Sequence, residues 1–328
     1  MEIIKLDILF YCNVINSTGF GHGFRCIKLA KILNLYDKNL NIGLKGNISA
    51  SAKNLLIKEY PDCLFFDPSD KVESNVGFID LMFDIEDPNI YDISFIKETY
   101  NNCRELIFLS SGTDAPNLNK NITIIGYQPN NKIYQSNNIY WGLEYAPTDK
   151  DQDKVEYERE NNSAFVALGG FKNSLELEII MQSLNELKFI KTINILISPV
   201  NENINFKSNS FRKDLNIFVH KNIISITSYL KKSSFVIASY GNLCFEALSY
   251  NAPLGIIGQK YFQIQYSKLL SKNDLALSIG LPSKIGKEKV REKINHLYIN
   301  RKNYLKNSLN KIPENGLKNI SNIIIKKL

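Results

Sequence analysis

Short apolar runs alternate with amphipathic segments along this chain of 328 residues, and this alternation limits the possible folds more than any other feature. Such runs are typical of buried parallel strands, and the segments between them have the period of helices. In the first half, the pattern predicts strands at 6–11, 41–44, 78–83, 105–110 and 122–125, and helices at 25–35, 50–59 and 94–101. An α/β fold with helices on both faces of a parallel sheet is therefore expected.

The alternation stops over 147–162, a segment rich in charged residues that is typical of a linker. It restarts with strands predicted at 164–168, 192–197, 216–219, 235–238 and 254–257, with helices at 175–187 and from Asn242, and with only helices after Gly286. We therefore expect two Rossmann-like domains, 1–146 and 163–328, joined by the linker 147–162. All terminal helices are assigned to the second domain, and a central cleft is expected between the carboxyl ends of the two sheets.

Charge and cysteine content exclude several classes of protein. The net charge of +7 favours anionic ligands, but the lysines are scattered, so no nucleic-acid partner is expected. The five cysteines are odd in number and show no CxxC spacing, which predicts neither a disulfide framework nor a zinc site. No metal or cofactor is expected. The chain shows no signal-like start and no apolar run of membrane-spanning length, which predicts a cytoplasmic protein.

The segment from Gly19 to Cys26 lies between the first predicted strand and the first predicted helix. A glycine-rich turn at a helix start suits an anion, because backbone N–H groups can point outward there. Within it, His22 can carry a proton near neutral pH, and Arg25 can support an anion. Phe24 stands where a dinucleotide fingerprint needs glycine, so that motif is absent. Two alternatives remain: Gly19 and Gly21 serve only the turn, and His22 only bonds a loop carbonyl.

A second segment, from Ser239 to Leu248, follows an apolar strand. Backbone donors from Ser239 through Gly241 to Asn242 would open the next helix and could receive a diphosphate. Glu246, one turn further, could accept hydrogen bonds from ribose hydroxyls. The alternative is that Ser239 only caps the helix and Glu246 is a solvated side chain.

Three other groups are weaker candidates. Gly169 and Gly170 follow a strand of the second half and mirror the first turn, although an ordinary turn would look the same. Gln263 gains meaning only from its spacing to Pro253 and Glu246. Four carboxylates lie near the end of a predicted strand: Asp80, Asp84, Glu86 and Asp87. One of them could orient His22 or a substrate, although such a run is more often a solvated loop.

Together these motifs resemble the PseG/SpsG family, whose best-known members hydrolyse a UDP-linked 2,4-diacetamido-2,4,6-trideoxyhexose during pseudaminic acid synthesis. That family is related to MurG-type glycosyltransferases of the GT-B fold. The motifs that carry the resemblance span nearly the whole chain, and they are Gly19 to His22 with Arg25-Cys26, Gly142 to Ala146, Leu168 to Gly170, Ser239 to Ala247, Pro253 with Gln263, and Asn315-Gly316.

The resemblance implies a GT-B fold and a UDP-sugar substrate. It implies that His22 is the catalytic base or acid, and that a second set of residues binds substrate or nucleotide: Gly19, Gly21, Arg25, Asp84, Gly169, Gly170, Ser239, Gly241, Asn242, Glu246 and Gln263. Departures from the family pattern at Glu86, Lys172 and Phe262 lie on the sugar side, which predicts a different sugar.

The leading hypothesis is a metal-independent UDP-sugar hydrolase of nonulosonic acid or surface-glycan biosynthesis, in which His22 activates water. A GT-B glycosyltransferase needs the same base and the same diphosphate site, and is the first alternative. A non-catalytic protein that binds sugar nucleotides is the second. The sequence makes no prediction of the sugar or of the oligomeric state.

Overall fold

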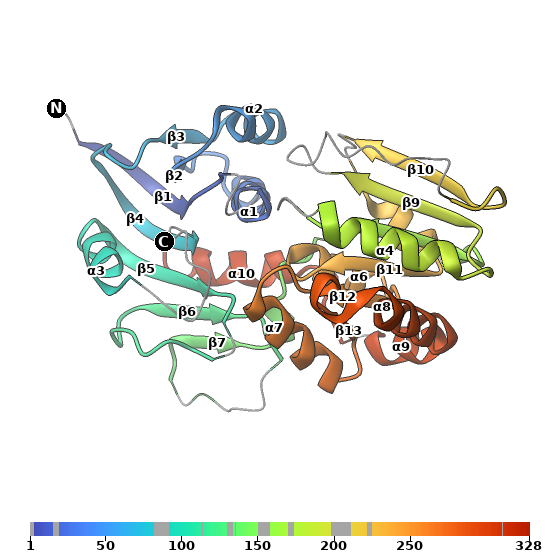
Figure 1. Cartoon of the computed structure of the whole chain (residues 1–328). Helices are drawn as coiled ribbons and strands as arrows, with labels where there is room; N and C mark the ends of the chain where they lie inside the picture. The colour runs from blue at the N-terminus through green and yellow to red at the C-terminus, as the bar shows by residue number, and fades with distance from the viewer. Residues whose placement is uncertain are drawn as a thin grey trace. The chain divides into compact units, whose positions relative to one another are not determined.

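The computed structural model of the chain describes residues 3–15, 20–81, 92–112, 114–129, 134, 136–149, 158–169, 174–197, 211–221, 225–309 and 311–328. The chain forms two compact units, each built around one β-sheet (Figure 1). Unit 1 consists of Met1–Asp149 and Asn315–Leu328, and unit 2 consists of Lys150–Glu314. Strands and helices alternate in both units, which confirms the predicted α/β class.

Unit 1 contains a seven-stranded sheet in the order β3-β2-β1-β4-β5-β6-β7, and its neighbouring strands run parallel. Its strands are β1 (Ile4–Cys12), β2 (Ile42–Lys45), β3 (Leu64–Phe66), β4 (Val72–Leu81), β5 (Cys103–Ser110), β6 (Thr123–Gly126) and β7 (Ile139–Trp141). Its described helices are α1 (Gly21–Tyr36), α2 (Ala50–Glu59), α3 (Ile93–Asn101), the 3-10 helix η1 (Leu143–Tyr145) and α10 (Gly316–Ile325). The strand order reverses between β1 and β4, and sheets of this kind bind ligands at such a switch point.

A β-bulge interrupts the pairing of β1 with β4 at this switch point. Tyr11 pairs with Ile79 and Cys12 pairs with Leu81, so that Asp80 is the extra residue on β4. A bulge bends the strand and changes the direction of the side chains around it. This local change of register explains how a charged residue near the end of a buried strand contacts helix α1.

Helix α1 begins at Gly21, four residues before its predicted start at Arg25. Gly21, His22 and Gly23 therefore form its first turn instead of a loop. A Cβ atom on the buried Gly23 would lie 2.7 Å from a methyl carbon of Val14, so close packing requires glycine there. Glycine has a low helix propensity, and this tertiary contact outweighs it.

Helix α10 belongs to unit 1, which corrects the predicted assignment of every terminal helix to the second domain. It packs against α1 and η1 through its apolar face. The Gly316 N–H donates to Thr148 Oγ1 at 3.1 Å, and a Cβ atom on Gly316 would lie only 1.7 Å from the carbonyl oxygen of Ala146. This close approach holds the returning chain against the segment that leads out of unit 1.

Unit 2 contains a six-stranded parallel sheet in the order β10-β9-β8-β11-β12-β13, which reverses between β8 and β11. Its strands are β8 (Ser163–Ala167), β9 (Thr192–Ile197), β10 (Asn216–Lys221), β11 (Phe235–Ser239), β12 (Leu254–Ile257) and β13 (Leu277–Gly280). Its described helices are α4 (Ser174–Glu186), α5 (Thr227–Lys232), α6 (Asn242–Ser249), α7 (Tyr261–Lys272), α8 (Pro282–Ile299) and α9 (Arg301–Ser308).

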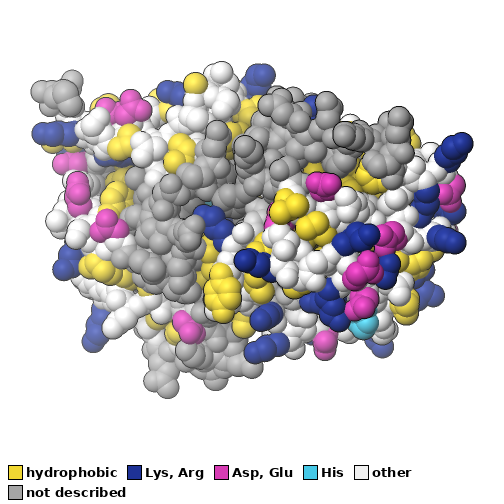
Figure 2. Space-filling view, viewed as in Figure 1, with side chains coloured by type: hydrophobic (Ala, Val, Ile, Leu, Met, Phe, Trp, Pro, Cys, Tyr) yellow, Lys and Arg dark blue, Asp and Glu magenta, His cyan; other side chains and the backbone are white. Residues whose placement is uncertain are grey.

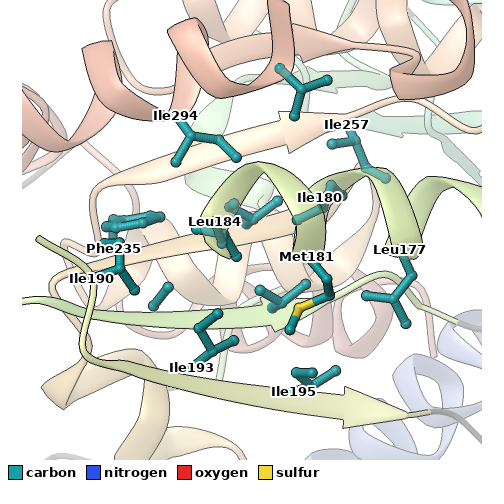
Figure 3. Close-up of a cluster of buried hydrophobic side chains, with 14 of the residues drawn as sticks. Leu177, Ile180, Met181, Leu184, Ile190, Ile193, Ile195, Phe235, Ile257 and Ile294 are labelled. Carbon is teal, nitrogen blue, oxygen red and sulfur yellow. The ribbon is translucent and has the colours of Figure 1, made fainter. Parts of the chain in front are cut away.

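The core of unit 2 follows from the periodicity of its helices and strands (Figure 3). The buried apolar residues of α4 recur at helical spacing and are Leu177, Ile180, Met181 and Leu184. Ile193 and Ile195 alternate along β9 and belong to the same cluster, as does Ile294 of α8. Burial of each such side chain stabilises the fold by about 1.5–3 kcal/mol, and this packing holds the turns at the ends of the strands.

Candidate functional site

Three side chains from two neighbouring elements meet at the switch point of unit 1. His22 and Arg25 lie three residues apart on α1, so they face the same side of the helix. Asp80 lies at the bulge of β4 and contacts both of them. The predicted first turn and one of the four predicted carboxylates therefore form one group, the His22 cluster, defined by His22, Arg25 and Asp80.

Both oxygens of the Asp80 carboxylate are engaged. Oδ1 lies 2.8 Å from Nδ1 of His22, and Oδ2 accepts a hydrogen bond of 2.7 Å from Nε of Arg25. Nη2 of Arg25 also donates to Oδ1, which makes the ion pair bidentate. Arg25 is 3% exposed and Asp80 is 6% exposed, so the pair is buried and each side chain has a fixed orientation.

The neighbouring groups keep the buried carboxyl group ionised. Burial alone disfavours its charged form, but the Arg25 guanidinium and the contact with His22 hold the pKa of Asp80 well below its usual range. Burial likewise disfavours the charge on Arg25, but the Asp80 carboxylate outweighs it and raises the pKa of the guanidinium. The cluster therefore contains a permanent negative and a permanent positive charge beside the imidazole at neutral pH.

The hydrogen bonds also determine which nitrogen of His22 can accept a proton. Ionised Asp80 is only an acceptor, so the network assigns the imidazole proton to Nδ1. Nη2 of Arg25 lies 2.9 Å from the same nitrogen, but a donor cannot bond to a protonated Nδ1. Nε2 then carries the lone pair, and none of the described residues donates to it. Because the His22 side chain is 25% exposed, this lone pair can serve a bound molecule.

Tyr127 and Cys26 complete the buried side of the cluster. The Tyr127 hydroxyl accepts a hydrogen bond of 3.4 Å from Nη1 of Arg25, and the Cys26 thiol donates to Oδ2 of Asp80 at 3.6 Å. Burial raises the pKa of both groups, so each stays protonated. The sequence gives no signal for Tyr127, because a tyrosine directly after an apolar strand is an ordinary core residue.

In unit 2, two of the predicted residues lie together at the switch point between β8 and β11. The Ser239 hydroxyl donates to the carbonyl oxygen of Leu168 at 2.7 Å, and Nε2 of Gln259 donates to the same oxygen at 2.7 Å. Gly169 follows with a φ of +73°, and a Cβ atom there would lie 3.0 Å from Oγ of Ser239. The structure thus brings Gly169 and Ser239 together and adds Gln259, which the sequence did not single out.

Gly241, Asn242 and Glu246 lie at the start of α6 and one turn beyond it. Gly241 is the N-cap residue and has no side chain with which to cap the helix, while Asn242 and Glu246 are half-buried. Gln263 on α7 differs from them, because it is 3% exposed and bonds to the backbone through both ends of its amide. The start of α6 therefore stays a candidate site for an anion.

The remaining predictions concern site residues outside the described ranges, metal sites and membrane-spanning helices. Gly19, Asp84 and Gly170 lie outside the described residues, and Gly21 is the exposed first residue of α1. Within the described ranges, no group of His, Cys, Asp and Glu side chains is arranged to hold a metal ion. None of the helices in that part of the chain combines the length and apolarity needed to cross a membrane.

Sequence comparison finds one distant curated relative, and no protein-family model matches this chain. The relative is an uncharacterised protein of Methanocaldococcus jannaschii that is 23% identical over 279 residues. The alignment covers 78% of this chain but 57% of that protein, so the chain spans little more than half the length of the relative.

Solved structures resemble the chain over nearly its whole length. Acinetobacter baumannii MurG superposes with a TM-score of 0.64 at 11% identity and covers 98% of this chain and 99% of its own. The spinosyn rhamnosyltransferase SpnG complexed with thymidine diphosphate gives 0.61 at 10% identity, covering 97% and 100%. A UDP-N-acetylglucosamine 2-epimerase gives 0.58 at 10% identity, covering 99% and 95%. The chain therefore has the predicted GT-B type of α/β fold, whereas the finer resemblance to the PseG/SpsG family stays a prediction.

Proposed function

We propose that this chain is a glycosyltransferase that moves a sugar from a nucleoside diphosphate to a hydroxyl group of an acceptor, with His22 as the general base. The observation that carries the proposal is the His22 cluster, in which an ionised and buried Asp80 orients the imidazole at a switch point. The fold supports it, because glycosyltransferases and a UDP-sugar epimerase are among the solved proteins that share it.

In the proposed reaction, Nε2 of His22 takes the proton of the acceptor hydroxyl as its oxygen attacks the anomeric carbon. A new carbon–oxygen bond forms, and the bond between the anomeric carbon and the diphosphate breaks. The electron pair of that bond leaves with the nucleoside diphosphate. Asp80 is a positioning residue that stabilises the imidazolium as it forms, and Arg25 keeps Asp80 ionised. General base catalysis of this kind contributes roughly 100- to 10,000-fold in rate.

We assign the diphosphate to the start of α6 in unit 2. Gly241 caps that helix without a side chain, and none of the residues in the first turn is acidic, so its first backbone amides belong to a positive dipole end. Such amides can stabilise the charge on the departing group without a metal ion. Arg25 is not assigned to the substrate, because its guanidinium is buried in the pair with Asp80.

Hydrolysis is the second candidate, with water in place of the acceptor hydroxyl. It is supported by the resemblance of Gly21-His22 with Arg25-Cys26, and of Pro253 with Gln263, to the PseG/SpsG pattern. The donor would then be a UDP-linked acetamido-deoxyhexose of the kind used in nonulosonic acid synthesis. Both reactions require the same base.

The test is release of nucleoside diphosphate from a panel of UDP- and TDP-linked sugars, including UDP-linked acetamido sugars, with and without alkyl glycosides as acceptors. His22→Ala should lower kcat/KM by about 100- to 10,000-fold, because the proton acceptor is lost. His296→Ala is the matched control, because His296 is exposed on α8 and should be replaceable. A metal chelator is expected to leave turnover unchanged.

Each outcome separates the candidates. Release that requires the acceptor supports transfer, and release in water alone supports hydrolysis. Full activity of His22→Ala contradicts the assignment of the base. Tight UDP binding without turnover of any donor contradicts both reactions and favours a non-catalytic binding protein.

A further inference from the structure

Gln263 on helix α7 connects two turns that follow neighbouring strands of unit 2. Its Oε1 atom accepts the backbone N–H of Gln259 at 2.7 Å and that of Lys260 at 3.1 Å. Its Nε2 atom donates to the carbonyl oxygen of Tyr240 at 3.1 Å. The first two bonds satisfy donors at the start of α7, as in a capping box, and the third reaches across to the turn after β11.

The Tyr240 carbonyl lies directly before the start of α6. The backbone N–H of Tyr240 donates to Ile257 of β12 at 3.1 Å, so this residue is held both by the sheet and by Gln263. The next residue, Gly241, is the N-cap of α6. Gln263 therefore restrains the backbone from which the first amide groups of α6 project.

Gln259 extends the same connection to a third turn. Its backbone is held by Gln263, and its side chain donates to the Leu168 carbonyl, which also accepts the Ser239 hydroxyl. The strands β8, β11 and β12 are neighbours in the sheet. The three turns at this switch point are therefore linked through side-chain bonds to the backbone, and Gln263 lies at the junction.

The bonds of Gln263 leave little capacity for a ligand. Its carbonyl oxygen accepts two hydrogen bonds, which is the usual capacity of an amide oxygen, and its amide nitrogen already donates to the protein. The residue is also 3% exposed. One N–H of Nε2 is not used by these bonds, but a nucleotide could reach it only if this buried side chain became more exposed.

We infer that Gln263 is a positioning residue that orients the start of α6 for the diphosphate without touching the ligand. The inference rests on the proposed function, in which that helix start receives the diphosphate. Donors that are already ordered bind more tightly, because no further ordering cost arises on binding. Loss of the bond to Tyr240 should therefore weaken nucleotide binding and leave the chemistry at His22 unchanged.

Gln263→Glu tests this bridge selectively. The carboxylate still accepts from the amides of Gln259 and Lys260 and suits a helix N-terminus, but it cannot donate to Tyr240. We expect the Kd for UDP, measured by calorimetry, to rise about tenfold, and the KM for the donor to rise with it. The kcat at saturating donor should stay within about twofold of wild type. The lost interaction stabilises the bound substrate and the transition state equally, so its loss does not change the barrier between them.

Two further variants separate the lost hydrogen bond from the added charge. Gln265→Glu makes the same substitution at an exposed position of α7 and should bind UDP as wild type does. Gln263→Met is neutral, lacks both ends of the amide, and should weaken UDP binding at least as much as Gln263→Glu. If Gln263→Glu does not fold, as judged by its Tm, Gln263→Met is assessed by the same Kd and KM criteria.

A wild-type Kd for UDP in folded Gln263→Glu and Gln263→Met would overturn the inference, as would a fall in kcat without a change in Kd. An equal loss in Gln265→Glu would also overturn it, since the effect would then be one of charge. If the Gln263 variants bind UDP as wild type does while His22→Ala lowers kcat/KM as expected, only the inference fails. If the wild-type protein neither binds UDP or TDP nor releases them from any donor, the proposed function fails and the inference fails with it.

Discussion

Each unit contains a network of opposite charges, and the two networks differ in their exposure to water. The network of unit 1 consists of Arg25 and Asp80, and that of unit 2 consists of Glu186, Lys287 and Arg291. The side chains of Arg25 and Asp80 are 2% and 0% exposed. Glu186 on α4 lies 2.6 Å from Lys287 and 2.5 Å from Arg291 on α8, and these two basic side chains are each 37% exposed. Figure 2 shows charged side chains of both signs intermingled over α4 and α8.

The difference shows that burial determines how much stability is lost when one member of a charge pair is removed. Water and salt screen the network of unit 2, so each of its members can be exchanged at little cost. In unit 1, removal of either partner leaves an uncompensated charge inside the protein. A buried and costly pair that orients a histidine is typical of a functional site, whereas an exposed network on two helices is an ordinary surface.

Asp80→Leu should have the largest effect on stability, because it leaves Arg25 as a buried cation without its counter-ion. We expect the free energy of unfolding to fall by about 3–5 kcal/mol. Trp141 is the only tryptophan and belongs to unit 1, so its fluorescence during urea unfolding follows that unit. Adding Arg25→Met should recover much of the loss. Wild-type stability of the single variant would contradict the importance of the pair.

Acid should act next most strongly, again through Asp80. Its pKa is lower in the folded state than in the unfolded chain, so its stabilisation is present above the unfolded pKa of about 3.9 and is lost as the pH falls below it. We expect the urea midpoint reported by Trp141 to begin to fall near about pH 5 and to keep falling below about pH 3, because the folded pKa of Asp80 lies well below its unfolded value. The fall in midpoint should be smaller in Asp80→Asn. If the midpoints of wild type and Asp80→Asn depend on pH in the same way, Asp80 is not the source of the acid sensitivity.

Glu186→Gln should have the smallest effect. It makes the same change, from carboxylate to amide, as Asp80→Asn, but at a solvated position of unit 2. Because water replaces the lost contacts, the urea midpoint measured by circular dichroism should not change detectably. A loss as large as that of Asp80→Asn would show that burial does not distinguish the two networks.

The fold can be predicted best where local signals mark both ends of an element. Helix α2 and strand β12 have their predicted bounds, and the Ser49 side chain caps α2. The strands β3 and β7 are absent from the predictions, because each has only three residues at an edge of the sheet, too few to show a strand period. The sequence also does not predict that α1 begins at Gly21, because this start depends on the packing of Gly23 against Val14.

The candidate site could be predicted only in part. His22 and Arg25 stand out beside glycines, but the choice of Asp80 among four carboxylates depends on a bulge created by the pairing of β1 with β4. In unit 2, the acceptors of the key hydrogen bonds are the backbone carbonyls of Leu168 and Tyr240, which have no signature in the sequence. Local patterns identify the reactive side chains, whereas their support depends on contacts between distant segments.

The position of α10 affects the order in which the two units mature during translation. Domains generally begin to fold as the chain leaves the ribosome, and unit 1 emerges first. Its helix α1, however, packs against residues 316–325, which are made only after all of unit 2. Unit 2 is continuous in sequence and can complete its own core without any later segment. The unit that carries His22 is therefore the first to be synthesised and the last to be finished.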